Sequence, residues 1–196
     1  MSYAGIIVTF VLINNLVLTY FLGLCPVLGA SRRTGAAVGL GLAATFVMGL
    51  GSLVTWTLYT LVLSPLGIEF LRTFVFVLTV AAIGHYLEVA IERLSPGLHY
   101  AVGRYLPMIS TNCVVLGIAL IVARGDYSAL ESLVAGVSAG VGFLLVALVV
   151  SSIRERLEIE RVPPAFRGIP IAFISTGLVA LAFLAFDRAF LQSILG

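Results

Sequence analysis

The chain has 196 residues, of which 61% are hydrophobic and 10% are charged, and its net charge is +2. A soluble domain carries about 25% charged residues, so this composition excludes an ordinary soluble domain. The small net charge and the lack of a basic patch also argue against a nucleic-acid partner.

Six apolar runs separated by short charged groups organise the sequence. Each is close to the roughly 20 residues that a helix needs to cross a bilayer core, and none alternates with the period of a strand. We therefore predict an all-α integral membrane protein with six transmembrane helices, folded as a single membrane domain over residues 1–196. The first run lacks the basic start of a signal peptide and is interpreted as a retained helix. The runs span approximately 4–24, 35–63, 70–91, 102–123, 129–153 and 169–186.

The arginines indicate which side of the membrane each loop occupies. With six spans, the loops after the first, third and fifth lie on one side, and they hold eight of the eleven basic residues, all arginine. Positive loops remain inside, so both termini are predicted outside a bacterial or archaeal cytoplasmic membrane. The eight are Arg32, Arg33, Arg93, Arg104, Arg154, Arg156, Arg161 and Arg167, and the opposite side holds Arg72, Arg124 and Arg188.

A short internal repeat places the two cysteines in register. Cys25-Pro-Val-Leu-Gly reappears as Cys113-Val-Val-Leu-Gly, and a Gly/Ala-rich run follows each copy, at 36–50 and 134–148. The first repeat then covers about 1–95 and the second about 96–196. Because each repeat holds three helices, the second copy enters from the opposite face, which makes an inverted pair.

Glycine and proline near both cysteines predict that helices 1 and 4 are interrupted there. Gly23 and Pro26 flank Cys25, and Pro107 precedes Cys113. Proline cannot donate within a helix but suits the first position of a new one, which would place Cys25 at an N-cap. Interrupted helices often mark functional sites near the membrane midplane.

Three interpretations of the cysteines remain open on these residues alone. Each could be a small buried hydrophobe, the two could form a disulfide, or both could ligate a metal as thiolates. Two thiolates are half of a usual [2Fe–2S] ligand set. His85 and His99 are expected near the cytoplasmic ends of their helices, so the missing ligands would come from a partner chain, such as a homologue of opposite orientation.

Polar residues beside the cysteines are candidates for an outer layer around such a centre. Buried amides and hydroxyls need partners in an apolar environment. Hydrogen bonding to the sulfurs is one use, and ordinary bonding between helices is the other. The candidates are Asn14, Asn15, Thr111 and Asn112, with Ser110 beside them.

These motifs resemble the RnfA/NqrE family of membrane subunits along the whole chain. The resemblance lies in Asn14-Asn15-Leu-Val-Leu, in Phe21-Leu-Gly-Leu-Cys-Pro and in Leu106-Pro through Thr111-Asn-Cys to Gly117. Ile153-Arg-Glu-Arg-Leu, followed by Val162-Pro and Phe166-Arg-Gly, resembles the family's fifth loop. The Asn-Asn, Cys-Pro and Thr-Asn-Cys elements favour the Rnf form, with Ser110 where many relatives would have threonine.

The resemblance implies a role in the Rnf ion-translocating ferredoxin:NAD oxidoreductase complex. Cys25 and Cys113 would ligate an intramembrane [2Fe–2S] cluster shared with two cysteines of an RnfE-like subunit of opposite topology. Electrons would pass between the ferredoxin/NAD side and external flavin carriers. RnfB, RnfC, RnfD and RnfG-like subunits would be neighbours, and no flavin is expected on this chain.

Two alternatives remain, and the chain carries no complete catalytic site of its own in either. One is the NqrE-type subunit of the sodium-pumping NADH:quinone reductase. The other is a small inverted-repeat secondary transporter that binds solute at the midplane. No carboxylate is predicted deep within a span; the acidic residues interpreted as interfacial are Glu69, Glu88, Glu92 and Glu131.

Overall fold

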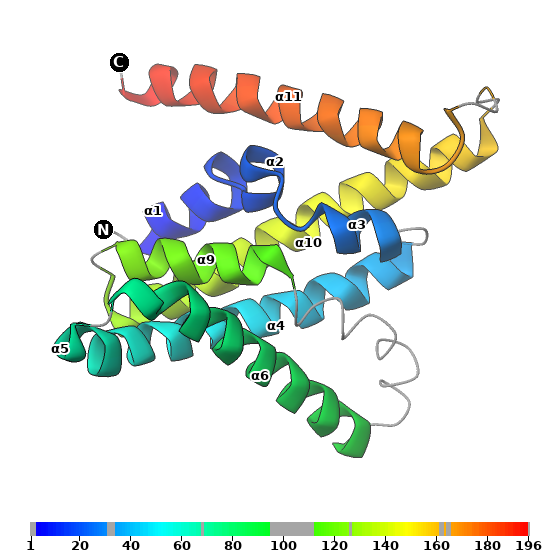
Figure 1. The fold of residues 1–196 in the computed structure, drawn as a ribbon. Helices are drawn as coiled ribbons and strands as arrows, with labels where there is room; N and C mark the ends of the chain where they lie inside the picture. Colours follow the sequence, from blue (N-terminus) through cyan, green and yellow to red (C-terminus); the bar gives the residue numbers. More distant parts are fainter. Residues whose placement is uncertain are drawn as a thin grey trace.

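The computed structural model describes residues 3–30, 34–67, 69–94, 112–125, 127–160, 163 and 166–195 (Figure 1). Within those residues every regular element is a helix, which confirms the predicted all-α class. The elements are α1 (Tyr3–Val8), η1 (Thr9–Ile13), α2 (Leu16–Tyr20), α3 (Leu24–Ala30), α4 (Thr34–Leu58), η2 (Tyr59–Leu63), α5 (Ser64–Leu66), η3 (Glu69–Leu71), α6 (Arg72–Leu94), α9 (Cys113–Arg124), α10 (Ala129–Ile159) and α11 (Ile169–Leu195).

Three stretches of helix in the described part of the chain are long and apolar enough to cross a membrane. They are Thr34–Leu63, Arg72–Ala90 and Ala129–Ile159, which match three of the predicted spans. Tyr3–Ile13, Cys113–Arg124 and Ile169–Phe183 are shorter apolar helices at the places of the other three. The six-span inverted repeat, its boundaries and the outside termini stay predictions.

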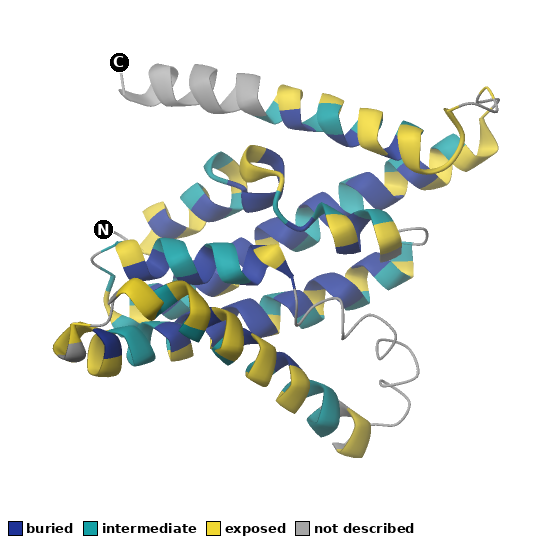
Figure 2. Ribbon diagram, viewed as in Figure 1, coloured by how far each residue is buried: buried dark blue, intermediate teal, exposed yellow. Residues whose placement is uncertain are grey.

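The centre of the molecule is the antiparallel pair of α4 and α10, the helices that hold the two Gly/Ala-rich runs. Thr45 lies against Gly140 and Ser52 against Gly136, so residue numbers rise along α4 as they fall along α10. The Ser52 hydroxyl donates to the Ser132 carbonyl at 2.8 Å. Small residues allow two backbones to approach closely, which is a common basis of helix packing in membranes. Figure 2 shows both helices buried along the sides that face the rest of the fold.

The first helix of each predicted repeat packs against the other repeat. The segments α1, η1 and α2 pack mainly on α10, whereas α9 packs mainly on α4. Phe10 and Phe143, from η1 and α10, and Val114 and Ile118, from α9, belong to the same buried core. The first helix of each predicted repeat therefore lies chiefly against the second helix of the other, which brings the segments around Cys25 and Cys113 into one region.

The structure divides the first predicted span, 4–24, at two places. The helix stops after η1 at Asn14 and restarts as α2, because the Asn15 side chain accepts from the Val17 N–H at 3.0 Å and caps the new helix. It stops again at Phe21 and Gly23, whose φ angles are +54° and +81°. Asparagine competes for backbone hydrogen bonds in this way, and so favours caps over helix interiors.

The fifth predicted span also ends later than expected. The sequence predicts a loop after residue 153, but α10 continues to Ile159 and includes Arg154, Glu155 and Arg156. Arg154 and Glu155 each bond to segments at the junction of α3 and α4, and these bonds hold the last turns of α10 against the fold.

Candidate functional site

Cys25 lies in the first turn of the short helix α3. That helix begins at Leu24, so Pro26 is its third residue and Cys25 is not the N-cap that the sequence predicted. Proline is tolerated there because first-turn N–H groups have no partner within a helix. Val27 is fully buried, whereas Cys25 is exposed. The turn thus anchors an apolar side chain in the core and leaves the thiol at the surface.

Cys113 is the first residue of α9. Asn112 precedes it as the N-cap, in an extended conformation, and its side-chain oxygen accepts from the Val114 N–H at 3.1 Å. Val114 and Val115 are fully buried. Cys113 is exposed, like Cys25. Both cysteines therefore lie in the opening turn of a helix whose next residues face the core. The predicted break before Cys25 is present at Phe21 and Gly23, whereas residues 101–111, before Cys113, lie outside the described part of the chain.

The two cysteine segments meet at Gly23. Its backbone N–H donates to the Cys113 Sγ at 3.0 Å, although the residues are far apart in sequence. A Cβ on Gly23 would overlap the Val114 side chain and lie 3.3 Å from the Asn112 Oδ1. Only glycine adopts its φ of +81° readily and leaves that space free. The sequence predicts Gly23 as part of a break, but it does not predict the contact with the thiol.

The state of the thiols bears on the open interpretations of the cysteines. Both are free, so they are not joined in a disulfide, and both are exposed, so neither is a small hydrophobe of the core. Exposed sulfur at the ends of two converging segments is available to a ligand or to a neighbouring chain. Metal ligation stays a prediction.

Asn112 adds an unused donor beside the second thiol. Its Oδ1 lies 3.9 Å from the Cys113 Sγ, while its Nδ2 is buried and has no hydrogen-bond partner within the described structure. The residue is 5% exposed. A buried amide nitrogen without a partner is costly, so an acceptor at this position would stabilise the protein.

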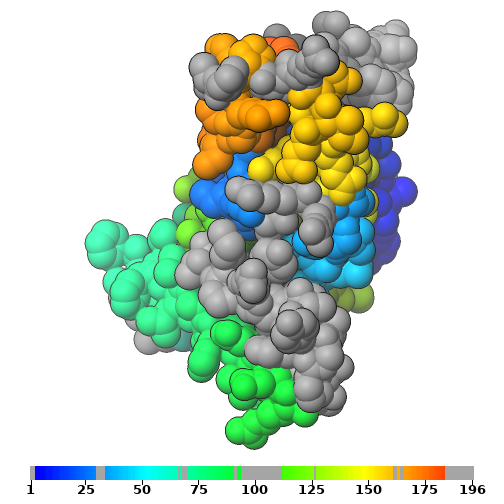
Figure 3. Space-filling model, turned by 90° about the vertical axis from the view of Figure 1, so that its right-hand side faces the viewer, coloured from blue at the N-terminus to red at the C-terminus, as the bar shows by residue number. Residues whose placement is uncertain are grey.

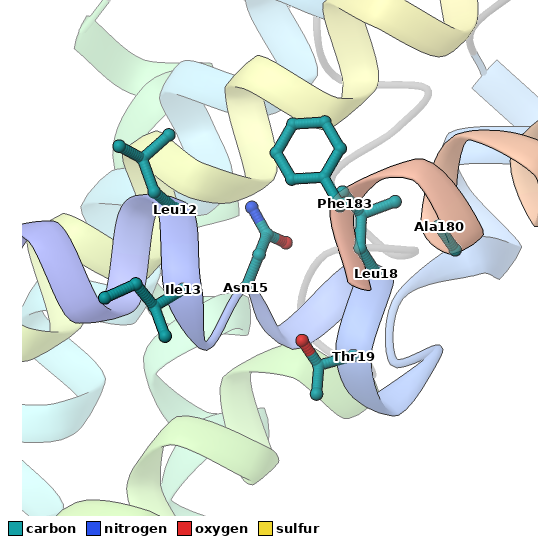
Figure 4. Close-up of a pocket in the computed structure, with 7 residues that line it drawn as sticks. All are labelled: Leu12, Ile13, Asn15, Leu18, Thr19, Ala180 and Phe183. Atoms are coloured by element: carbon teal, nitrogen blue, oxygen red, sulfur yellow. The ribbon is translucent and has the colours of Figure 1, made fainter. Parts of the chain in front are cut away.

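Asn15 has a different role in the structure. Its Nδ2 donates to the carbonyls of Val11 and Gly142, both at 3.1 Å, and so ties the break in helix 1 to α10. Figure 4 shows it beside a small cavity of about 10 Å³, at the lower limit for one water molecule. Its lining residues are Leu12, Ile13, Asn15, Leu18, Thr19, Ala180 and Phe183. A role for Asn14 or Asn15 around a metal centre stays a prediction.

Several predicted residues lie outside the part of the chain that the structure describes. His85 is described: its side chain is 78% exposed and lies 3.9 Å from Glu88. Among the described residues, no three of His, Cys, Asp and Glu gather where they could hold a metal ion. The residues outside are Ser110, Thr111, Pro107, His99, Arg32, Arg33, Arg104 and Arg161.

Comparison with known proteins matches residues 3–189 to the family described as "Rnf-Nqr subunit, membrane protein". The chain is 45% identical over 187 residues to a subunit of the Na⁺-translocating ferredoxin:NAD⁺ oxidoreductase complex of Acetobacterium woodii, covering 95% of this chain and 97% of that one. It is 48% identical over 175 residues to a subunit of the ion-translocating oxidoreductase complex of Rhodobacter capsulatus, covering 89% and 91%.

A third relative extends the match to another organism. The corresponding subunit of the ion-translocating oxidoreductase complex of Edwardsiella ictaluri is 46% identical over 186 residues, covering 95% of this chain and 96% of that one. The resemblance to RnfA, predicted from the motifs around Asn14, Cys25 and Cys113, is thereby confirmed. The chain belongs to the Rnf-Nqr family of membrane subunits, among relatives that are named as subunits of ion-translocating oxidoreductase complexes.

Proposed function

We propose that this chain, as the RnfA-type subunit of a membrane-bound, ion-translocating oxidoreductase, supplies Cys25 and Cys113 as ligands of a shared [2Fe–2S] cluster. One observation carries the proposal. The chain has two cysteines, and the segments that hold them meet where the Gly23 N–H reaches the Cys113 Sγ at 3.0 Å. The Cys113 sulfur thus lies against the backbone two residues before Cys25, and two cysteines on segments in contact suit one centre rather than two separate roles.

The donors around the thiols fit an anionic sulfur centre. Thiolates that ligate iron are commonly stabilised by N–H groups directed at sulfur, and such bonds tune the potential of a cluster. Gly23 supplies one such N–H. The Nδ2 of Asn112 has no hydrogen-bond partner among the described residues, and a cluster sulfur would give it an acceptor.

The ligand count points to a second chain, since this chain has two cysteines. A [2Fe–2S] cluster takes four ligands, and no group of three candidate ligands occurs among the described residues. The missing pair would come from the homologous RnfE-like subunit of opposite topology, facing the exposed Cys25 and Cys113. RnfB, RnfC, RnfD and RnfG-like subunits would complete the electron path between the ferredoxin/NAD side and external flavin carriers.

The residues of this chain bind and shield the centre. When bound, the cluster supplies one-electron transfer at an intermediate point in an apolar layer about 30 Å thick. Cys25 and Cys113 would hold it from two helix starts, and Gly23 directs its N–H at the Cys113 sulfur. The buried Val27 and Val114 close the protein side of the site to water. Donors in a dry site stabilise added negative charge more strongly than they would in water.

The NqrE-type alternative differs in the complex that the chain joins, whereas a small transporter differs in kind. The three relatives named above belong to ferredoxin:NAD⁺ or ion-translocating oxidoreductase complexes, which favours the Rnf-type assignment. A transporter would move solute by itself and would not depend on either thiol.

The test uses the complex purified with its partner subunits. Iron and acid-labile sulfide are measured together with the EPR spectrum of the wild type, Cys25→Ser, Cys113→Ser and the control Ser152→Ala. Ser152 is an exposed hydroxyl on α10. We expect one [2Fe–2S] signal to vanish in both cysteine variants and persist in the control. Signals unchanged in both cysteine variants, or solute transport by this chain alone, would contradict the proposal.

A further inference from the structure

Arg154, near the end of α10, is a buried cation that holds the helix of Cys25. Its side chain is among the buried charged groups, with 8% of the residue exposed. Its Nη1 donates to the Leu28 carbonyl of α3 at 2.6 Å. In the view of Figure 3, the end of α10 (yellow) lies beside α3 (blue) and the start of α4 (light blue).

Helix α3 needs support of this kind. It has seven residues, well below the roughly 12–15 that make an isolated helix even marginally stable in water. Leu28 is among its last four residues, whose carbonyls have no partner within the helix. A guanidinium donor at a helix C-terminus satisfies such a carbonyl and interacts favourably with the negative end of the helix dipole. A charge-assisted bond of this type is stronger than a neutral one.

The next residue of α10, Glu155, bonds to the start of α4, the helix that follows α3. The Glu155 carboxylate accepts from the Thr34 N–H at 2.8 Å and from the Thr34 hydroxyl at 2.7 Å. Thr34 is the first residue of α4. Two adjacent side chains of α10, Arg154 and Glu155, thus form hydrogen bonds to the last turn of α3 and the first turn of α4.

We propose that Arg154 is a positioning residue for Cys25, an inference that rests on the proposed function. Leu28 follows Cys25 by three residues, so the two lie about one turn apart on the same side of α3. Fixing the Leu28 carbonyl therefore fixes the rotation and axial position of the turn that carries the Cys25 thiol. Cys113 has no such need, because α9 has twelve residues and its own Asn112 cap.

The test compares Arg154→Met, which keeps an unbranched side chain without the donor, with Arg154→Lys, which keeps a cationic donor. Arg156→Met removes the same charge from an exposed position two residues away. Hydrogen exchange is measured in the purified complex on peptides that cover α3, α9 and α4. The [2Fe–2S] EPR spectrum is recorded on the same samples.

Arg154→Met is expected to speed exchange in α3 by about tenfold or more, the size expected for a lost charge-assisted bond. Exchange in α9 should not change. The EPR signal should lose amplitude or shift its g values because Cys25 is no longer held. Arg154→Lys should restore both readouts in part, and Arg156→Met should match the wild type.

Equal exchange in α3 for the wild type and Arg154→Met, or faster exchange spread evenly over α3, α9 and α4, would overturn the inference. So would an unaltered EPR signal in Arg154→Met. A wild-type complex with no signal that depends on Cys25 and Cys113 would instead overturn the proposed function. The hydrogen-exchange result would then decide by itself whether Arg154 holds α3.

Discussion

The segments around Cys25 and Cys113 carry nearly the same five residues, yet the fold supports them differently. α9 has twelve residues and is capped at its own start by Asn112. α3 has seven residues, and a neighbouring helix supports it through Arg154. The shared pattern therefore specifies an exposed sulfur in an opening helical turn, while the supporting contacts come from elsewhere in the chain.

The difference also shows which parts both segments share. α4 and α10 are long, regular and closely packed, and both contact α3 and α9. Gly23 joins the segments to each other through its N–H and the Cys113 thiol. Substitutions in the α4–α10 pair should thus disturb both cysteine segments. Substitutions at Gly23 should disturb the contact between the two segments, and substitutions at Asn112 should disturb only the segment of Cys113.

The largest effect on folding is expected from Gly136→Val, in the contact between α4 and α10. Any Cβ at Gly136 would overlap the Ser52 hydroxyl and press on the backbone of α4. Forcing extra atoms into a packed core costs about 1–3 kcal/mol and more where backbone must move. We expect little folded subunit in the membrane, measured by its yield and by gel filtration of the complex. Gly177→Val is the control, because a Cβ at Gly177 meets nothing within 4 Å.

The next largest effect is expected from Gly23→Ala, at the contact between the two cysteine segments. The left-handed conformation costs alanine about 1–2 kcal/mol, and its methyl would also overlap Val114. The two segments should separate, so most of the [2Fe–2S] EPR signal should be lost while much of the protein still folds.

Gly67→Ala separates strain from contact in that experiment. Gly67 has a φ of +68°, similar to Gly23, but a Cβ there meets nothing within 4 Å. It should bear the same conformational cost and retain the EPR signal. An equal loss of EPR signal in both variants would mean that backbone strain, and not the lost contact with Cys113 and Val114, explains the result at Gly23.

The sequence is sufficient to predict the helical class, three spanning helices and the break in helix 1 near Cys25. Apolar length, glycine, proline and the repeated Cys-x-Val-Leu-Gly pattern are local signals, and local signals can be interpreted without a fold. The break at Asn14 and Asn15 also has a local signal, since asparagine is a strong N-cap. Interpreting both residues only as polar groups inside a helix misses that signal.

Contacts between distant residues have no such local signal. Nothing in Ile153-Arg-Glu-Arg-Leu indicates that Arg154 bonds to Leu28 or that Glu155 bonds to Thr34. A charged run after a long apolar helix ordinarily marks the end of a membrane span, which is why the sequence predicts a loop there. The Gly23 contact with Cys113 also cannot be predicted from local sequence, because it depends on how α9 packs.

A smaller effect is expected from Asn112→Ser, compared with Asn112→Ala. Serine keeps a side-chain oxygen to cap α9 but removes the buried amide donor. Stability should therefore be retained, while the midpoint potential of the cluster should shift to a lower value, because one donor to reduced sulfur is gone. Redox titration followed by EPR measures this shift.

Asn112→Ala should show the same shift together with a loss of stability of about 0.5–2 kcal/mol, since the cap is lost as well. Thermal unfolding of the complex separates the two variants. A potential that is unchanged in both would mean that the Asn112 amide does not face the cluster.

The smallest effect is expected from Ser128→Ala, at the end of α10 opposite Arg154. Ser128 and Glu131 form a capping box in which the Glu131 carboxylate accepts from the Ser128 N–H at 2.9 Å. Losing the serine oxygen weakens only the first turn of a 31-residue helix, so the melting temperature should fall by a few degrees or less. The EPR spectrum should be identical to that of the wild type. An altered spectrum would show that the two ends of α10 are coupled, and that the support of Cys25 extends along the whole helix.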